Sequence, residues 1–286
     1  MNFRLGPSLL AIFMGFIIGV CSGYYSNHDA AEGLAVKVDG NFGAPVAVQV
    51  EGRITRAEQH ITVNKGTGRE IVENSAVLVR VSNFAYSGGY IMPLEDATLK
   101  ATAATEKDLG DLYSLLLGAT EGSRLIGVYP HESKANAEII VLDVLPTVIL
   151  GEPLPIAGMP AGISVNSDDS GIPSVSADGA KIAQESVAVV IRGEGEQVKQ
   201  DAVVYANYII TNTSGEVLES TFGVAPIPSI DPQQVFSGLA QAIRDQRVGS
   251  RIVAAIPATQ ARGDGDVIVV IDILAVRDGK SLNSQR

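Results

Sequence analysis

The sequence of 286 residues has one cysteine, three histidines and no tryptophan, and aromatic residues make up only 5% of it. A single cysteine cannot form a disulfide within the chain, so disulfide bonds do not stabilise the fold. His28, His60 and His131 are far apart in the sequence and no pair has the spacing of metal ligands, so we expect neither a metal site nor a metal cofactor. Because aromatic residues are so few, any ligand pocket should be mostly aliphatic.

Charged residues are also few, at 19%, and acidic ones outnumber basic ones, which gives a formal net charge of −11. A chain this acidic repels phosphate backbones, which argues against nucleic acid as a partner. No serine lies in a nucleophile-elbow pattern, so nothing supports hydrolysis by a catalytic triad. Gly193 and Gly195 lie between two predicted strands and not before a helix, so they indicate a turn and not a phosphate-binding loop or other cofactor site.

The first residues resemble a targeting segment. Arg4 is the only charged side chain before Asp29, and an unbroken apolar run covers residues 9–20. A basic residue followed by such a run is typical of a secretory signal, and counting from Leu5 the stretch also approaches the length of a membrane anchor. We therefore interpret residues 1–21 as a signal peptide or membrane anchor, with the rest of the chain outside the cytoplasm.

The only cysteine lies at the end of this run. Ile18-Gly19-Val20-Cys21 resembles a bacterial lipobox, in which the cysteine thiol takes a lipid, although Val20 departs from the small residue expected before the cysteine. Lipidation of Cys21 and a plain signal or anchor therefore both stay open. A lipid on Cys21 would hold the protein at the outer surface of the cell membrane on a short tether.

The remainder of the chain repeats itself at a shift of 127 positions. Gly66-Thr67-Gly68 falls on Gly193-Glu194-Gly195, and Gly122-Ser123-Arg124 falls on Gly249-Ser250-Arg251, with no gap in between. Farther on, a shift of 129 places Asp143 on Asp272, each inside an apolar run. A period this long predicts two whole domains and not a solenoid of short repeats.

Each copy has the pattern of an α+β domain, in which an antiparallel sheet wraps around one short helix. In the second copy, the composition and spacing of apolar residues predict a helix over 232–247 and strands over 187–191, 202–211, 216–220, 252–256 and 267–276. Asp231-Pro232 is a typical helix start, and Gly249 a typical helix end. In the first copy, Thr105 and Asp108 form a capping-box pattern before an expected helix over 109–117.

These patterns give a division of the chain. We expect domains over 34–150 and 187–278, joined by a semi-extended connector over 151–186 that is rich in Pro, Gly and Ser. Arg124 and Arg251 are interpreted as solvated charges at strand starts, whose recurrence reflects the fold. Asp143 and Asp272 are expected to face the polar side of each sheet.

The second copy resembles the FKBP-type peptidyl-prolyl cis-trans isomerases in the order of its motifs. The matching stretches are Gly193-Glu194-Gly195, Tyr208, Gly215, Leu218-Glu219-Ser220, Val235-Phe236-Ser237-Gly238-Leu239 and Val248-Gly249-Ser250-Arg251. The resemblance covers about 187–276, and it extends more weakly through the repeat to about 36–145. A tandem of this kind behind a lipoprotein-like leader is similar to exported FKBP-type proteins of Gram-positive bacteria.

The resemblance implies a set of substrate-binding residues and no certain catalytic residue. The substrate-binding set is Tyr208, Leu218, Glu219, Val235, Phe236, Leu239 and Ile271. Several of these depart from the family pattern: Leu239 replaces a Trp, Leu218-Glu219 replaces a Phe-Asp pair, and Ile271 replaces a Phe. Arg262 stands where the family has a tyrosine that binds a substrate carbonyl. The first copy departs further, with Val81, Leu109 and Leu112 in place of Tyr208, Phe236 and Leu239.

The resemblance thus implies a peptidyl-prolyl isomerase or folding helper, which acts on proline-containing exported polypeptides at the cell surface and needs no cofactor. The alternative is a catalytically inactive FKBP-like binding or chaperone scaffold, in which Phe236, Leu239 and Ile271 simply pack in the core and Tyr208 is a half-buried strand residue. A third possibility, an immunoglobulin-like adhesin, has no place for the helix predicted over 232–247.

Overall fold

A computed structural model of the chain describes residues 24–26, 35–52, 56–131, 136–263 and 265–278. The predicted signal or anchor segment, residues 1–21 with Cys21, lies outside these described residues. Within them, none of the helices has the length and apolar character of a membrane-spanning segment.

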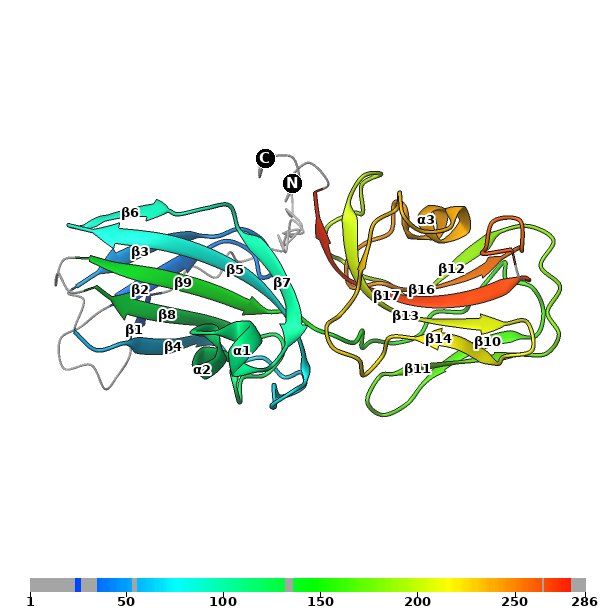
Figure 1. The fold of residues 1–286 in the computed structure, drawn as a ribbon, viewed down its shortest axis with the longest axis horizontal. Coiled ribbons are helices and arrows are strands. Elements are labelled where there is room, and N and C mark those ends of the chain that lie inside the picture. The colour runs from blue at the N-terminus through cyan, green and yellow to red at the C-terminus, as the bar shows by residue number, and fades with distance from the viewer. Residues whose placement is uncertain (1–23, 27–34, 53–55, 132–135, 264, 279–286) are drawn as a thin grey trace, which may run out of the picture.

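The chain folds into two units of the same architecture (Figure 1). The main sheet of the first unit is antiparallel and has the strand order β4-β8-β9-β5-β6, with β7 also pairing with β5. The main sheet of the second unit has the matching order β12-β16-β17-β13-β14, with β15 pairing with β13. The predicted fold class, two antiparallel sheets each accompanied by short helical structure, is confirmed.

The elements of the first unit are β1 (Tyr24–Ser26), β2 (Ala35–Asp39), β3 (Ala47–Glu51), β4 (Gln59–Asn64), β5 (Ala76–Ser87), β6 (Tyr90–Pro93), β7 (Thr98–Ala103), α1 (Glu106–Leu109), α2 (Leu112–Leu116), β8 (Arg124–Pro130) and β9 (Asn136–Val144). Those of the second unit are β10 (Ile163–Ser167), β11 (Pro173–Ala177), β12 (Ser186–Ile191), β13 (Val203–Asn212), β14 (Val217–Ser220), β15 (Ser229–Ile230), α3 (Ser237–Ile243), β16 (Arg251–Ile256) and β17 (Val267–Arg277).

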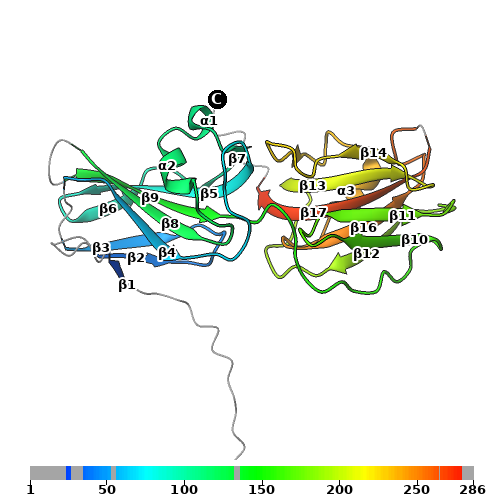
Figure 2. The same cartoon turned by 90° about the horizontal axis from the view of Figure 1, so that it is seen from below.

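Each main sheet is buried on both faces. In the second unit, Leu239 and Ile243 of α3 pack against one face, and Ile163 of the β10–β11 hairpin belongs to the buried cluster on the other. Figure 2 shows β10 and β11 in front of the sheet and α3 behind it. Strands covered on both sides read as continuous apolar runs and not as alternating patterns. This explains why β17 is buried along almost its whole length.

The helices are shorter than their sequence patterns suggest. The helix expected over 232–247 is α3 alone, because Asp231 instead forms a turn in which its side chain accepts a hydrogen bond from Gln233 N–H at 2.9 Å. In the first unit, the capping box is present: Thr105 Oγ1 accepts from Asp108 N–H at 3.1 Å. The helix that it starts ends at Gly110, whose φ is +58°, and a second short helix follows.

The expected connector over 151–186 contains regular structure. Its middle forms the β10–β11 hairpin, which matches the β2–β3 hairpin of the first unit: β10 follows β2 by 128 positions, and β11 follows β3 by 126. The hairpin packs against the main sheet of the second unit, so the interpretation of this whole stretch as a semi-extended connector is wrong at its centre. The proline- and glycine-rich composition reflects the turns and not a lack of structure.

Arg251 and Asp272 form a buried ion pair at the joint between hairpin and sheet. Arg251 Nε and Asp272 Oδ1 lie 2.6 Å apart, and both side chains are fully buried. The guanidinium also donates to Ser167 Oγ at 2.6 Å and to the Gly171 carbonyl at 2.7 Å, both in the hairpin. The expected solvated arginine and outward-facing aspartate are therefore corrected: they neutralise each other inside the protein.

The first unit repeats this arrangement. Arg124 Nε pairs with Asp143 Oδ1 at 2.6 Å, and the same guanidinium donates to the carbonyls of Gly40 and Asn41 in the β2–β3 hairpin at 2.9 Å. Asp143 also accepts from Gly43 N–H. The recurrence noted in the sequence thus reflects a buried joint that each unit uses to attach its hairpin.

The two units are packed against each other. Leu78 and Leu145 of the first unit belong to the same buried cluster as Ile163 and Val270 of the second. Asn207 on β13, which is 3% exposed, donates from Nδ2 to the Thr147 carbonyl at 2.9 Å. The connection between the units is therefore a packed interface and not a free linker.

Candidate functional site

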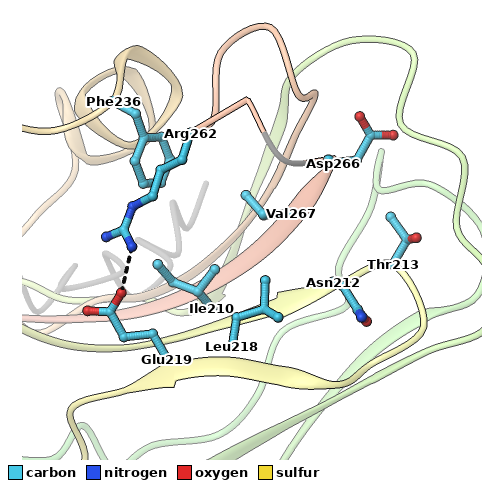
Figure 3. Close-up of a pocket in the computed structure, with 10 residues that line it drawn as sticks. Ile210, Asn212, Thr213, Leu218, Glu219, Phe236, Arg262, Asp266 and Val267 are labelled. Atoms are coloured by element: carbon cyan, nitrogen blue, oxygen red, sulfur yellow. Dashed lines mark ion pairs between the residues drawn. The ribbon is translucent and has the colours of Figure 1, made fainter.

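A cavity of about 540 Å³ opens in the second unit between the β13–β14 hairpin, the start of α3 and the loop that leads into β17 (Figure 3). Its lining residues come from these elements: Ile210, Asn212, Thr213, Leu218, Glu219, Phe236, Arg262, Gly265, Asp266 and Val267. The volume falls within the range of small-ligand sites.

The centre of the cavity is apolar. Ile210, Leu218 and Val267 lie together between its two polar ends (Figure 3). Leu218 is 56% exposed on the edge strand β14, and the register shifts between Ile210 and Thr211, which leaves Leu218 without a paired residue on β13. Such a bulge commonly re-aims a side chain, and here it presents a large apolar group to the cavity. The result is a solvent-exposed aliphatic surface that a small apolar ring could cover.

One end of the cavity is lined by a chain of polar contacts. Tyr208 donates its hydroxyl proton to Glu219 Oε1 at 2.6 Å, and Arg262 Nη1 lies 3.1 Å from Glu219 Oε2. The Arg262 guanidinium carbon is 5.8 Å from the centre of the Phe236 ring, within the range of a cation–π contact. Both carboxylate oxygens of Glu219 are therefore engaged, whereas the guanidinium keeps further N–H donors beside the cavity.

The position of Phe236 follows from the local fold. It is the N-cap of α3, with an extended backbone at φ −65° and ψ 149°, and it stands at the cavity wall where the chain enters the helix. Because the helix begins there and not at Asp231, the ring is held at the mouth while Leu239 and Ile243 point into the core.

Burial and the hydrogen bond to Glu219 together raise the pKa of Tyr208 to about 12. Both effects favour the neutral phenol, since the ring is partly removed from water and faces a carboxylate. Tyr208 therefore remains a hydrogen-bond donor to Glu219 throughout the physiological pH range.

We expect Tyr208 to titrate about two pH units above an ordinary tyrosine, whose pKa is about 10. Because the folded pKa is raised, its contribution to stability is fully present below about pH 10 and is lost as the pH rises through about 12. Absorbance titration of the wild type minus the Tyr208→Phe variant isolates this group. A difference curve with its midpoint near 10 would contradict the buried Tyr208–Glu219 contact.

The opposite end of the cavity carries Asp266, Asn212 and Thr213 (Figure 3). Asp266 Oδ1 accepts a hydrogen bond from Ala258 N–H at 2.9 Å, which fixes the carboxylate at the base of the loop. The Asn212 side chain is occupied within its own turn, where its oxygen accepts from Ser214 N–H at 3.0 Å and its Nδ2 donates to Glu216 Oε2 at 2.9 Å.

The structure brings together some of the residues that the sequence suggested. Leu218, Glu219 and Phe236 line the cavity, and Tyr208 joins it through Glu219. Leu239 and Ile271 are 3% and 0% exposed and lie in the core. Val235 packs against the same core cluster and does not line the cavity.

Sequence reasoning missed Ile210, Asp266 and Val267 as lining residues, and it noted Arg262 only as a departure from the family pattern. The one sequence signal that could have identified Ile210 is the alternation of side chains along a strand. Ile210 lies two residues after Tyr208 and is therefore expected on the same face of the sheet. In the first unit, Val81 and Leu109 are 8% and 3% exposed and belong to the core on the helix side of the sheet. Across the described ranges, no group of three or more His, Cys, Asp or Glu side chains could hold a metal ion.

Comparisons with known proteins give structural likenesses only. No family model matches the sequence, and no curated protein matches it. The crystal structure of FkpA from Escherichia coli is similar over 42% of this chain and 53% of its own, with 20% identity and a TM-score of 0.32. This chain thus spans about half the length of FkpA.

Two further solved structures are similar. A peptidyl-prolyl cis-trans isomerase from Pseudomonas syringae pv. tomato matches over 41% of this chain and 83% of its own, with 16% identity and a TM-score of 0.31. The three FKBP domains of wheat FKBP73 match over 77% of this chain and 95% of their own, with 14% identity and a TM-score of 0.32.

Proposed function

We propose that this protein is a peptidyl-prolyl cis-trans isomerase, or folding helper, for exported polypeptides, and that the cavity of the second unit receives the proline. The observation that carries the proposal is the aliphatic centre formed by Ile210, Leu218 and Val267 beside the Phe236 ring. This surface suits a pyrrolidine ring, and Leu218 is largely exposed.

The chemistry requires no nucleophile and no metal. The peptide bond resists rotation because of C–N resonance, with a barrier of about 18–20 kcal/mol. A prolyl amide that leaves water for an apolar cavity loses hydrogen bonds to its carbonyl, and this favours the twisted amide, which is less dipolar than the planar one. Arg262, with N–H donors beyond those that bind Glu219, can hold a neighbouring carbonyl of the bound chain at the mouth.

A protease-coupled or NMR exchange assay on the full chain tests this proposal. We expect faster cis-trans exchange than in buffer for peptides with several different residues before proline. A rate equal to that in buffer for every peptide would refute the isomerase.

A second candidate, a non-catalytic binding scaffold, is favoured by one observation. Leu239 and Ile271 are buried in the core, so the hollow between helix and sheet is filled at these positions and the remaining cavity lies toward the edge of the sheet. Suppression of aggregation that does not depend on proline in the client, together with no isomerisation, would support the scaffold.

We further propose that the N-terminus anchors the protein to the cell membrane, outside the cytoplasm. Arg4, the apolar run that follows and the placement of Cys21 support this location. Fractionation of a bacterial host would test it, since recovery of the intact protein in the cytosol would rule out export.

A further inference from the structure

The two ends of the cavity differ in charge. At one end, the Glu219 carboxylate is neutralised by Arg262 at 3.1 Å. At the other, Asp266 takes part in no ion pair within the described part of the chain, and its one hydrogen bond there comes from the neutral Ala258 N–H. Figure 3 shows these ends on opposite sides of Ile210 and Leu218, with the Asp266 carboxylate at the rim of the cavity and directed away from these two side chains.

A second carboxylate adds to the uncompensated end. Glu216 Oε2 accepts from Asn212 Nδ2 at 2.9 Å, and Asn212 lines the cavity on the Asp266 side. Glu216 also forms no ion pair with any residue that the structure describes. The Asn212 carboxamide is engaged in its turn and carries no charge, so among the residues that the structure describes neither carboxylate at this end is paired with a cation.

An apolar centre with negative charge at one end selects a particular kind of ligand. If a proline lies over Leu218, the side chain of a neighbouring residue of the same peptide can reach Asp266. That side chain is attracted to the carboxylate if it is cationic and repelled if it is anionic. The net charge of −11 on the whole chain acts in the same direction at longer range.

We propose that the cavity selects proline-containing segments with a lysine or arginine close to the proline, and that Asp266 is the group that binds this cation. This inference rests on the proposed function only in placing a proline at the apolar centre. Asp266 acts here as a specificity-determining residue. Glu219 is already bound by Tyr208 and Arg262, so it attracts a further cation more weakly than Asp266 does.

The experiment compares three peptides that differ only in Lys, Ala or Glu next to the proline, with both affinity and kcat/KM measured on the full chain. At low salt, about 0.01 M, we expect the Lys peptide to exceed the Ala peptide by about two- to five-fold, as for an exposed ion pair, and the Glu peptide to be weakest. At about 1 M salt, where the Debye length is about 3 Å, the ratio should approach one.

Asp266→Asn tests the assignment, because the asparagine oxygen can still accept from Ala258 N–H while the charge is lost. We expect the Lys-to-Ala ratio to fall close to one in this variant. Glu73→Gln, which removes an exposed carboxylate in the first unit, should leave all ratios as in the wild type.

The outcomes separate the two proposals. A preference for the Lys peptide in binding without any isomerisation would support cation selection and overturn the isomerase. Isomerisation with equal values for the three peptides, or a Lys preference that survives Asp266→Asn, would overturn the role of Asp266. Failure of every peptide to bind would overturn both.

Discussion

Replacement of Arg251 by methionine is expected to lower the free energy of unfolding of the second unit by about 3–5 kcal/mol, the range for breaking a buried ion pair by removing one partner. The side chains of Arg251 and Asp272 are both 0% exposed. Methionine would leave the Asp272 carboxylate buried without a counter-ion, although it still accepts a hydrogen bond from Ile149 N–H at 2.9 Å. Burial already raises the pKa of Asp272, and the contacts from Arg251 counteract this.

The same substitution also loosens the hairpin. Arg251 donates to Ser167 Oγ and to the Gly171 carbonyl, so methionine removes the polar contacts that join β10–β11 to the main sheet. The Gly171 carbonyl is buried, and leaving it without a donor is expected to contribute about 1–3 kcal/mol of the loss, whereas Ser167 is exposed and can bond to water. Faster amide exchange in β10 and β11 than in β13 would show this local effect.

Urea unfolding followed by circular dichroism measures the change in the full chain. Arg244→Met is the matched control, because it removes an exposed guanidinium from the end of α3, and it should change stability by less than about 0.5 kcal/mol. The double variant Arg251→Met with Asp272→Leu should recover part of the loss, since no buried charge then remains. A loss below about 1 kcal/mol for Arg251→Met alone would mean that the pair does not hold the joint.

The limits of sequence reasoning are clearest at this pair. The repeat revealed that Arg124 and Arg251 occupy equivalent positions, but the partners of Arg251 lie 21 residues away in Asp272 and 84 residues away in Ser167. Local patterns carry no information on contacts at such distances. Asp272 lies between apolar neighbours in a strand with both faces covered, so alternation could not tell which face it occupies.

The strands could be predicted because their signals are local. β13, β16 and β17 begin and end within one residue of the expected ranges, since β-branched runs and flanking turn residues define them. The helix predicted over 232–247 is longer than the observed α3, because Asp231-Pro232 is as typical of a turn as of a helix start. Here the Asp231 side chain caps the turn at Gln233 and leaves Phe236 to begin α3.

The candidate site could be predicted only in part, for a similar reason. Leu218, Glu219 and Phe236 were suggested by motif order, and they do line one cavity. Leu239 and Ile271 lie in the core, because α3 packs directly on β16 and β17 and leaves no room there. Ile210 and Asp266 line the cavity because of strand pairing and the path of the loop before β17. Local sequence patterns predict neither of these.

Phe236→Ala is the substitution with the largest expected effect on the proposed activity. We expect kcat/KM for prolyl peptides to fall about ten- to a hundred-fold, equivalent to about 1.4–2.8 kcal/mol of lost transition-state stabilisation. The ring forms one wall of the cavity and also supports Arg262, whose guanidinium lies 5.8 Å from its centre. Its removal widens the mouth, admits water to the prolyl amide and deletes the cation–π contact that supports Arg262.

Two further variants make this expectation specific. Phe236→Leu keeps an apolar wall but loses the cation–π contact, so its kcat/KM should lie between those of the wild type and Phe236→Ala, with urea unfolding close to the wild type. Tyr90→Ala is the matched control, because it deletes an aromatic ring that is 78% exposed on β6 of the first unit and should leave kcat/KM unchanged. If Phe236→Ala retains more than half of the wild-type activity, the proline does not bind in this cavity. If Tyr90→Ala loses as much as Phe236→Ala, the first unit takes part in substrate binding, and the cavity of the second unit alone cannot account for the activity.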